Sequence, residues 1–146
     1  MDPLEAVTVA TSQPVYSGTP QRKQVLLGHV IATQTHNETV HDQDMELPED
    51  WSASNPQVGH KESGRTVCIH SLAVLPAFQH QGLGRLLLKS YIQRIESSGL
   101  AERIAIITHE PLISYYESFG FENIGPSQVK FGGGNWSDMV LEFDKP

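Results

Sequence analysis

The chain contains runs of branched apolar residues, which are typical of strands, and one stretch in which apolar residues recur at the intervals of an α-helix. Residues 25–33 and 66–74 are rich in β-branched and aliphatic side chains, which predicts two strands, the second ending before Pro76. Residues 85–98 repeat apolar side chains at intervals of three and four, which predicts an amphipathic helix that ends at Gly99. The apolar stripe expected on this helix consists of Leu83, Leu86, Leu87, Tyr91 and Ile95.

Shorter elements follow this helix. Residues 104–108 and 121–125 carry short apolar runs typical of strands, and residues 139–143 predict a last strand. Residues 112–119 predict a short helix that stops at Gly120. The order strand, helix, strand, helix, strand is that of an α/β layer, and we therefore expect one α/β domain.

Two segments have no regular period. Residues 1–22 mix Thr, Ser, Pro and small apolar residues, which predicts a flexible lead-in to a domain over residues 23–146. Residues 34–64 are rich in Asn, Asp, Glu, His and Pro, which predicts a long loop or an insertion. Such a loop either serves the function or is a disordered segment without a task, and the sequence favours neither.

Composition narrows the classes of function. The 146 residues, 38% of them hydrophobic, suffice for one core, and the net charge of -7 disfavours a nucleic-acid partner and weakly supports a cationic substrate. Cys68 is the only cysteine, so no internal disulfide can form and we expect a cytoplasmic protein. No stretch approaches the roughly 20 apolar residues of a membrane span, and the N-terminus lacks a signal-peptide pattern, so we expect no membrane partner.

The candidate chemistry lies where the second strand leads into the helix. Gly82 and Gly84 lack side chains, so backbone N–H groups there can approach an anion closely, and the helix N-terminus adds favourable partial positive charge. A pyrophosphate suits this geometry. A tight turn into a helix explains the same two glycines equally well.

The stretch Gln79-His80-Gln81-Gly82-Leu83-Gly84 matches the pattern of Gln or Arg, two residues, Gly, one residue, then Gly or Ala. Together with residues 69–74 and 115–121, it resembles the GNAT superfamily of N-acetyltransferases. The resemblance extends over residues 25–143 and is strongest to the serotonin (arylalkylamine) branch and its fungal polyamine-acetylating relatives. It implies the GNAT fold, a mixed and mostly antiparallel sheet flanked by helices, and an N-acetyltransferase with acetyl-CoA as co-substrate.

The resemblance also implies roles for individual residues. The backbone of the strand around Ala73 would pair with the pantetheine arm of acetyl-CoA, and the stretch from His80 to Arg85 would hold its pyrophosphate. The implied cofactor-binding residues are Leu72, Ala73, Val74, Gln79, His80, Gln81, Gly82, Leu83, Gly84 and Arg85. Tyr116 would lie near the CoA sulfur and protonate the departing thiolate, or it would instead pack between helix and sheet.

His70 is the candidate base, because imidazole can accept a proton from an amine near neutral pH. In the arylalkylamine branch two histidines occupy the positions of Cys68 and His70, so this chain departs from the pattern at Cys68. Strand alternation predicts Thr66, Cys68, His70, Leu72 and Val74 on one face. A nucleophilic Cys68 activated by His70 is a weaker alternative than a buried apolar cysteine, because residues two apart on a strand are separated by about 7 Å.

The predicted function is acetyl transfer to the primary amine of a small arylalkylamine, similar to serotonin or tryptamine, or of a polyamine. The family usually carries a strand and two helices ahead of the strand at residues 25–33, and only about two dozen residues precede it here. A truncated, non-catalytic CoA-binding domain and an acetyltransferase for protein lysines or N-termini therefore stay open as alternatives. The histidines show no metal-ligand spacing, so we expect no metal, and the sequence indicates no oligomeric state.

Overall fold

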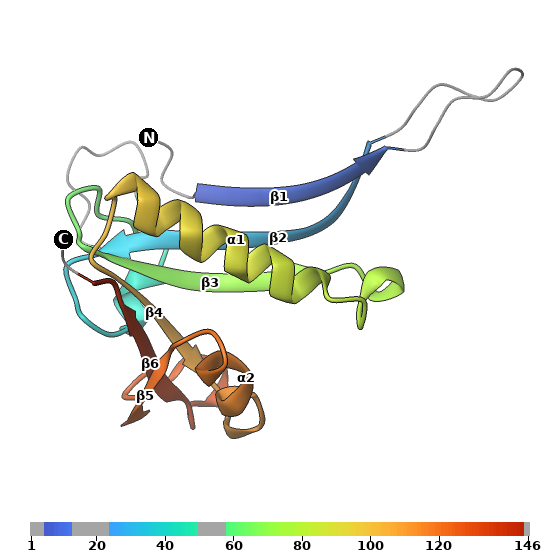
Figure 1. Ribbon diagram of the computed structural model, residues 1–146. Helices are drawn as coiled ribbons and strands as arrows, with labels where there is room; N and C mark the ends of the chain where they lie inside the picture. Colours follow the sequence, from blue (N-terminus) through green and yellow to red (C-terminus); the bar gives the residue numbers. More distant parts are fainter. Residues whose placement is uncertain (1–4, 13–23, 50–57, 145–146) are drawn as a thin grey trace, which may run out of the picture.

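A computed structural model describes residues 5–12, 24–49 and 58–144, which form a six-stranded sheet in the order β1-β2-β3-β4-β6-β5 (Figure 1). The strands are β1 (Glu5–Ser12), β2 (Gln24–Thr35), β3 (Thr66–Val74), β4 (Arg103–Thr108), β5 (Glu122–Pro126) and β6 (Ser137–Glu142). β3 and β4 run parallel, and the other neighbouring pairs are antiparallel. The expected mixed and mostly antiparallel sheet is confirmed.

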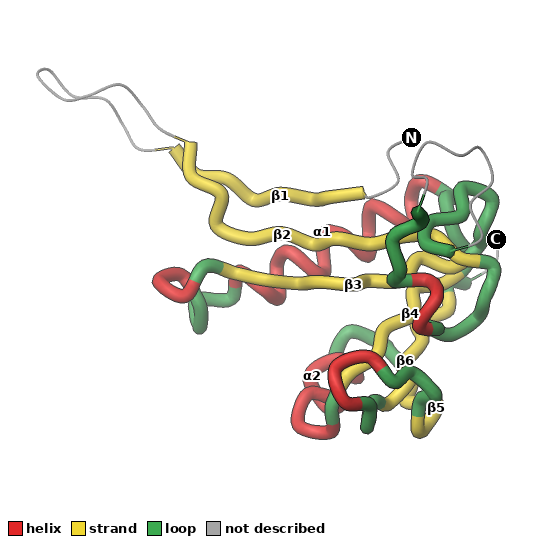
Figure 2. Tube along the Cα trace, turned by 180° about the vertical axis from the view of Figure 1, so that it is seen from behind, coloured by secondary structure: helices red, strands yellow, loops and turns green. Residues whose placement is uncertain are grey.

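Within the described ranges, two α-helices accompany the sheet, α1 (Leu83–Ser98) and α2 (Ile113–Glu117). α1 lies across one face of β2 and β3, and the view from behind in Figure 2 shows those strands in front of it. The short 3-10 helices η1 (Asp42–Asp44), η2 (Pro76–Phe78), η3 (Glu110–Leu112) and η4 (Phe131–Gly133) lie in the connections. Among the described residues, no helix combines the length and the apolar character needed to cross a bilayer.

The amphipathic pattern of α1 is confirmed, except that Leu88 and not Leu86 lies on the buried side. Leu87, Leu88, Tyr91 and Ile95 form its buried side. Leu86, which we expected in the apolar stripe, is 53% exposed and is therefore a wrong assignment. The row of Leu87, Tyr91 and Ile95 at intervals of four points into the core, so Leu86 lies on its solvent side and Leu88 on its inner side. Gly99 ends the helix with φ 67°, as expected.

Each face of the sheet carries its own apolar cluster. The face under α1, here called the α1 face, is filled by a cluster that includes Val30, Val67, Tyr91 and Ile104. The opposite face, here called the loop face, has a smaller cluster, which consists of Val40, Cys68, Ala105, Val129 and Val140. Residues from two connections, 36–49 and 127–136, cover the loop face.

The expectation of a flexible lead-in over residues 1–22 is wrong for residues 5–12. Residues 5–12 form β1, which pairs antiparallel with β2 from Glu5 opposite Ala32 to Ser12 opposite Gln24. Small apolar residues are interspersed there with Thr8 and Thr11, and pairing with a neighbouring strand satisfies the backbone that such a short run cannot satisfy alone. Residues 13–22 lie outside the described part of the chain.

The connections also differ from the expectation in detail. β2 extends to Thr35, so it takes in the first two residues of the predicted 34–64 loop, and η1 forms inside that loop. Residues 50–57 of the loop are outside the described ranges. The helix expected over residues 112–119 is shorter than predicted, because α2 begins at Ile113 and ends at Glu117, and Leu112 belongs to the preceding η3.

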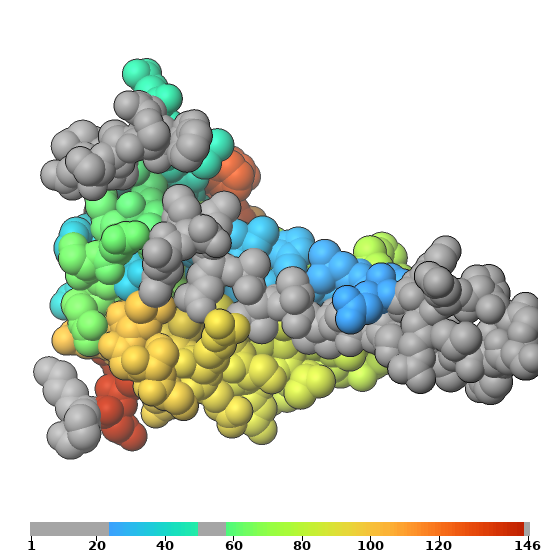
Figure 3. All heavy atoms as spheres, turned by 90° about the horizontal axis from the view of Figure 1, so that it is seen from above, coloured from blue at the N-terminus to red at the C-terminus, as the bar shows by residue number. Residues whose placement is uncertain are grey.

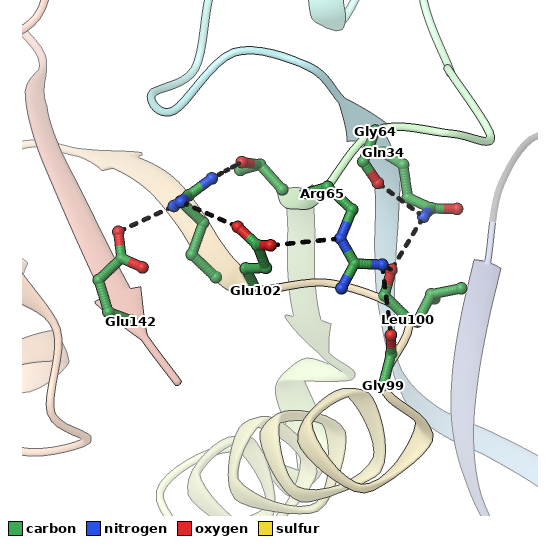
Figure 4. Close-up of polar contacts among 9 residues, drawn as sticks. Gln34, Gly64, Arg65, Gly99, Leu100, Glu102 and Glu142 are labelled. Atoms are coloured by element: carbon green, nitrogen blue, oxygen red, sulfur yellow. Dashed lines mark hydrogen bonds and ion pairs between the residues drawn. The ribbon is translucent and has the colours of Figure 1, made fainter. Parts of the chain in front are cut away.

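Polar contacts hold β3, β4 and β6 together at one end of the sheet (Figure 4). The guanidinium of Arg103 donates to the Glu142 carboxylate at 2.8 Å and to the Thr66 hydroxyl at 3.0 Å. Arg65 donates to the Leu100 carbonyl at the end of α1, and the space-filling view shows residues 58–66 beside that end (Figure 3). These contacts keep β3 and β4 together at this end, while their other ends are free to separate.

Candidate active site

β3 and β4 pair over only three residues and then separate. The parallel ladder joins Thr66–Cys68 to Arg103–Ala105 and stops there, although β3 continues to Val74. Figure 1 shows the two strands diverging beyond that point. The β3 edge that faces β4 is therefore open from residue 69 to residue 74, and its backbone can hydrogen-bond an extended ligand placed beside it. Leu72, Ala73 and Val74 lie on this open edge.

The N-terminus of α1 follows this edge by way of η2. Gly82 precedes the helix with φ 83°, and a Cβ added there would meet no atom within 4 Å. The first turn has no side-chain cap and no acidic residue, so its backbone N–H groups stay available and the partial positive charge of the helix end is not neutralised. This geometry can bind an anion, and the expected loop-to-helix turn is present.

The loop ahead of α1 is held by its own side chains. Gln79 donates from its amide nitrogen to the Val74 carbonyl at 2.9 Å, and His80 has φ 63°, which is uncommon for a residue other than glycine. Arg85 donates to the Ser118 hydroxyl at 3.1 Å, and its guanidinium lies 4.5 Å from the centre of the Phe119 ring. Gln79 and Arg85, two of the residues predicted to bind the cofactor, thus also contact other residues of the chain.

His70 sits at a bulge in β3. Ile31 pairs with Ser71 and Ala32 pairs with Ile69, so His70 is an extra residue on this strand. Its Nε2 lies 2.7 Å from the Thr33 hydroxyl, and Thr33 pairs with Cys68, which places His70 on the loop face. The bulge therefore keeps His70 on the loop face, two residues beyond the last pair between β3 and β4.

The bulge overturns the expected alternation along β3. Cys68 belongs to the loop-face cluster, whereas Leu72 packs against the α1-face cluster. A Cβ on Gly28 would approach Val74 and Leu87 together, so Val74 also lies on the α1 side. The prediction that Leu72 and Val74 share one face with Cys68 and His70 is wrong, because one extra residue inverts the alternation beyond it.

Burial makes the His70 imidazole a weaker base. It lowers the pKa of His70 below the ordinary value, and the Asp44 carboxylate partly opposes this effect. The ring is therefore neutral at neutral pH and can accept a proton.

Asp44 organises the segment that covers His70. Its carboxylate accepts hydrogen bonds from the Thr35 hydroxyl at 2.7 Å, the Asn37 amide and the His41 backbone N–H. Its carbonyl oxygen accepts a hydrogen bond from the Thr33 hydroxyl at 3.2 Å. This part of the predicted loop is therefore ordered by one buried carboxylate, which sequence patterning did not single out among the neighbouring acidic residues.

Cys68 is an inert thiol rather than a nucleophile. Its side chain is fully buried, and burial, followed by the carboxylates of Asp44 and Asp138, raises the pKa of the thiol far above its ordinary value. A thiolate, the reactive form, is thus strongly disfavoured. These observations favour the buried apolar cysteine that the sequence suggested.

Tyr116 lies on α2 at the other face of the sheet. Its ring packs against the α1-face cluster and makes edge contacts with Tyr115 at 5.2 Å and Phe121 at 6.0 Å between ring centres. Burial, and then the neighbouring Tyr115, raise the pKa of Tyr116, so the phenol keeps its proton at neutral pH. A proton donor and a proton acceptor thus lie on opposite faces, with the opening between β3 and β4 between those faces.

Three residues of this region were not predicted, namely Thr33, Asp44 and Asp138. Thr33 could have been found from the pairing of the two predicted strands, because it lies directly opposite Cys68. Asp138 becomes visible only through strand register, since it precedes the apolar run that predicts the last strand. Within the described ranges, no three His, Cys, Asp or Glu side chains gather as metal ligands.

Comparison with known proteins identifies the family to which this architecture belongs. Residues 13–143 match the family described as the acetyltransferase (GNAT) domain. Serotonin N-acetyltransferase of Mesocricetus auratus is 37% identical over 73 residues, which make up 50% of this chain and 35% of that relative. The match thus spans about a third of the relative's length.

Solved structures agree with this fold. The loading GNATL domain of CurA from Lyngbya majuscula has a TM-score of 0.59 at 16% identity, over 80% of this chain and 71% of that one. A Bacillus subtilis acetyltransferase in complex with CoA has a TM-score of 0.53 at 18% identity, over 82% of this chain and 71% of that one. At these identities the likeness concerns the fold alone. With a family match that extends over nearly the whole sequence, the chain belongs to the GNAT acetyltransferase family.

Proposed function

We propose that this chain transfers the acetyl group of acetyl-CoA to the primary amine of a small arylalkylamine or polyamine. The observation that carries the proposal is the junction of three features at one opening in the sheet: the unpaired β3 edge, the N-terminus of α1 and the imidazole of His70. The similarity to serotonin N-acetyltransferases supports a small amine as acceptor.

Acetyl-CoA suits the α1 side of this opening. Its pantetheine arm carries amide groups that can pair with the open backbone edge at Leu72, Ala73 and Val74. Its pyrophosphate suits the uncapped first turn of α1, where Gly82 leaves space and Arg85 adds positive charge. Both assignments follow from backbone geometry, so they require no particular side chain at most of the positions involved.

Transfer of the acetyl group then requires loss of protons from the acceptor nitrogen and protonation of the CoA sulfur. The acceptor arrives as an ammonium ion, and His70 takes one of its protons so that the nitrogen lone pair can attack the thioester carbonyl carbon. A carbon–nitrogen bond forms, the carbon–sulfur bond breaks, and Tyr116 gives its proton to the departing CoA sulfur. The nitrogen loses its second proton as the amide forms, and this proton restores Tyr116. The proton on His70 passes to solvent, which leaves an N-acetylamine and free CoA.

Release of free thiol from acetyl-CoA tests this proposal. The chain is mixed with acetyl-CoA and, separately, with tryptamine, phenylethylamine, spermidine and a lysine-containing peptide, while calorimetry measures CoA binding. Amine-dependent release with the small amines, and little with the peptide, is the expected result. CoA binding without release from any amine would instead identify a binding domain without transferase activity.

His70→Gln serves as the matched catalytic variant in that assay. Glutamine can keep a hydrogen bond to the Thr33 hydroxyl but cannot accept a proton, so turnover should fall by about a hundredfold while CoA affinity stays constant. Unchanged turnover would remove His70 from the mechanism.

A further inference from the structure

Asp138 on β6 is a buried carboxylate that the reaction as described does not use. Its side chain is only 9% exposed, and its Oδ1 is closed to solvent and has no hydrogen-bond partner among the described residues. Burial raises the pKa of Asp138, whereas a hydrogen bond from Ser127 and the nearby His41 lower it. A buried carboxylate oxygen without a donor is costly, and a cation with N–H groups would remove that cost.

The register of the sheet places Asp138 in relation to His70. Cys68 pairs with Ala105, and Ala105 pairs with Val140, so these three form one row across the loop face. Two residues further toward the opening, β6 presents Asp138 opposite Ile107 of β4.

His70 takes the corresponding place on β3, two residues beyond Cys68. Its contact with Thr33 keeps it on the same face in spite of the bulge. Asp138 is close enough to Cys68 for its charge to raise the pKa of that thiol. His70 and Asp138 therefore lie on the two sides of β4, on one face, where β3 and β4 part.

The spacing of these two residues suits an acceptor with two nitrogens. Two strand spacings, on the order of 10 Å, separate their backbones, and the divergence of β3 adds to this distance. An alkyl chain of a few methylenes with an amine at each end can place one nitrogen at His70 and the other at Asp138. An aromatic ring in the same position would leave the carboxylate buried without a partner.

We propose that Asp138 binds a second ammonium group of the acceptor, and that it thereby selects diamines and polyamines over arylalkylamines. This inference rests on the proposed acetyl transfer and narrows its acceptor class. In this binding mode the carboxylate of Asp138 receives the second ammonium group, while the reacting nitrogen gives its proton to His70.

Access to Asp138 runs through the segments that cover the loop face. Val129 and Trp136 from one connection, and Val40 and Met45 from the other, pack over the cluster next to it. Because Oδ1 is closed to solvent, the binding mode proposed here requires part of this cover to shift when the acceptor enters. The exposed Phe131 starts the short η4 turn in one of these connections.

Equilibrium binding tests the inference without relying on turnover. The chain is saturated with CoA, and calorimetry compares 1,4-diaminobutane with butylamine, which has the same carbon chain and lacks the second ammonium, and with tryptamine. The diamine should bind at least tenfold more tightly than butylamine, in keeping with one charge-assisted hydrogen bond. Equal affinities, tighter binding of tryptamine, or no measurable diamine binding would overturn the proposal.

Asp138→Asn is the informative variant, because the amide keeps the shape of the side chain and removes its charge. It should abolish the preference for the diamine and leave butylamine affinity within about twofold. Glu122→Gln, an exposed acidic residue on neighbouring β5, is the matched control and should retain the preference. A preference that survives in Asp138→Asn contradicts the inference.

Failure of the proposed function gives a different pattern from failure of this inference. Absence of thiol release with every amine refutes acetyl transfer, but the comparison of diamine with butylamine is still decided by binding. Thiol release that is fastest with tryptamine keeps the transferase and refutes the role of Asp138. If the Asn variant does not fold, the two amines on the unchanged chain still decide the question.

Discussion

The Nε2 atom of His70 lies 2.7 Å from the hydroxyl oxygen of Thr33, and the same hydroxyl lies 3.2 Å from the carbonyl oxygen of Asp44. A hydroxyl has one proton to donate, and a carbonyl can only accept. When Thr33 donates to Asp44, its oxygen is free to accept from Nε2–H, which leaves Nδ1 of His70 as the nitrogen that takes up a proton. With a protonated imidazole, this is the one arrangement in which both hydrogen bonds, from His70 to Thr33 and from Thr33 to Asp44, can form.

Replacement of Thr33 by valine should therefore alter the pH dependence of the reaction. Valine cannot accept from Nε2–H, so the protonated ring loses stabilisation and the pKa of His70 falls further below its ordinary value. The acid limb of kcat/KM, which rises as His70 loses its proton, should move to lower pH, and the maximal rate should drop by about tenfold as the ring loses its anchor. Initial rates across pH check both effects.

Thr33→Ser is the control for that experiment. Serine keeps the hydroxyl and loses only a methyl group, so the acid limb should stay at the wild-type pH. A shift of equal size in both variants would mean that packing around Thr33, and not its hydrogen bond, sets the pKa of His70.

Tyr116→Phe should separate chemistry from binding. Burial keeps the phenol protonated, so its loss removes the donor to the CoA sulfur while the ring contacts with Tyr115 and Phe121 remain. We expect kcat to fall by about a hundredfold and CoA affinity to change by less than about twofold. Turnover like that of the unchanged chain would assign Tyr116 to packing alone.

The strands and the main helix could be predicted because their signals are local. β3 has the residues predicted for it, and α1 ends at the predicted glycine. β1 was missed because its stability comes from pairing with β2 rather than from its own short and weakly apolar run.

The candidate site was less predictable, because it depends on a bulge. Nothing in residues 66–74 marks His70 as the extra residue, and without that residue the alternation predicts Leu72 on the wrong face. Asp44 and Asp138 come from segments far apart in the chain. Hydrogen bonds within residues 35–44 place Asp44, and strand register places Asp138, so neither position could be inferred from local sequence.

Cys68→Ala should leave catalysis intact. The thiol is fully buried with a strongly raised pKa, so removing it should cost stability on the order of 1 kcal/mol through lost packing and change kcat by less than about twofold. Thermal unfolding and turnover are measured on the same sample. An acetylated Cys68 in the mass spectrum, with turnover lost in the Ala variant, would establish covalent transfer instead.

Gly82 and Gly99 offer a matched test of the anion site, because they flank the two ends of α1 with similar backbone angles. Their φ values are 83° and 67°, and an added Cβ would meet nothing within 4 Å at either position. Alanine at either site should therefore cost a similar strain energy, about 1 to 2 kcal/mol. Only Gly82 adjoins the uncapped N–H groups, so Gly82→Ala should weaken CoA binding by about tenfold, and Gly99→Ala should leave it unchanged.

Calorimetric CoA titration and thermal unfolding of both variants decide this comparison. Each variant forces an alanine at one end of α1 into the left-handed region, so the strain energy is similar in both. It therefore cancels when their CoA affinities are compared. A difference in CoA affinity then reports on the site and not on the stability of the fold. Equal loss of affinity in both variants would mean that CoA binding depends on the integrity of α1 as a whole, and the pyrophosphate would have to be assigned elsewhere along the open β3 edge.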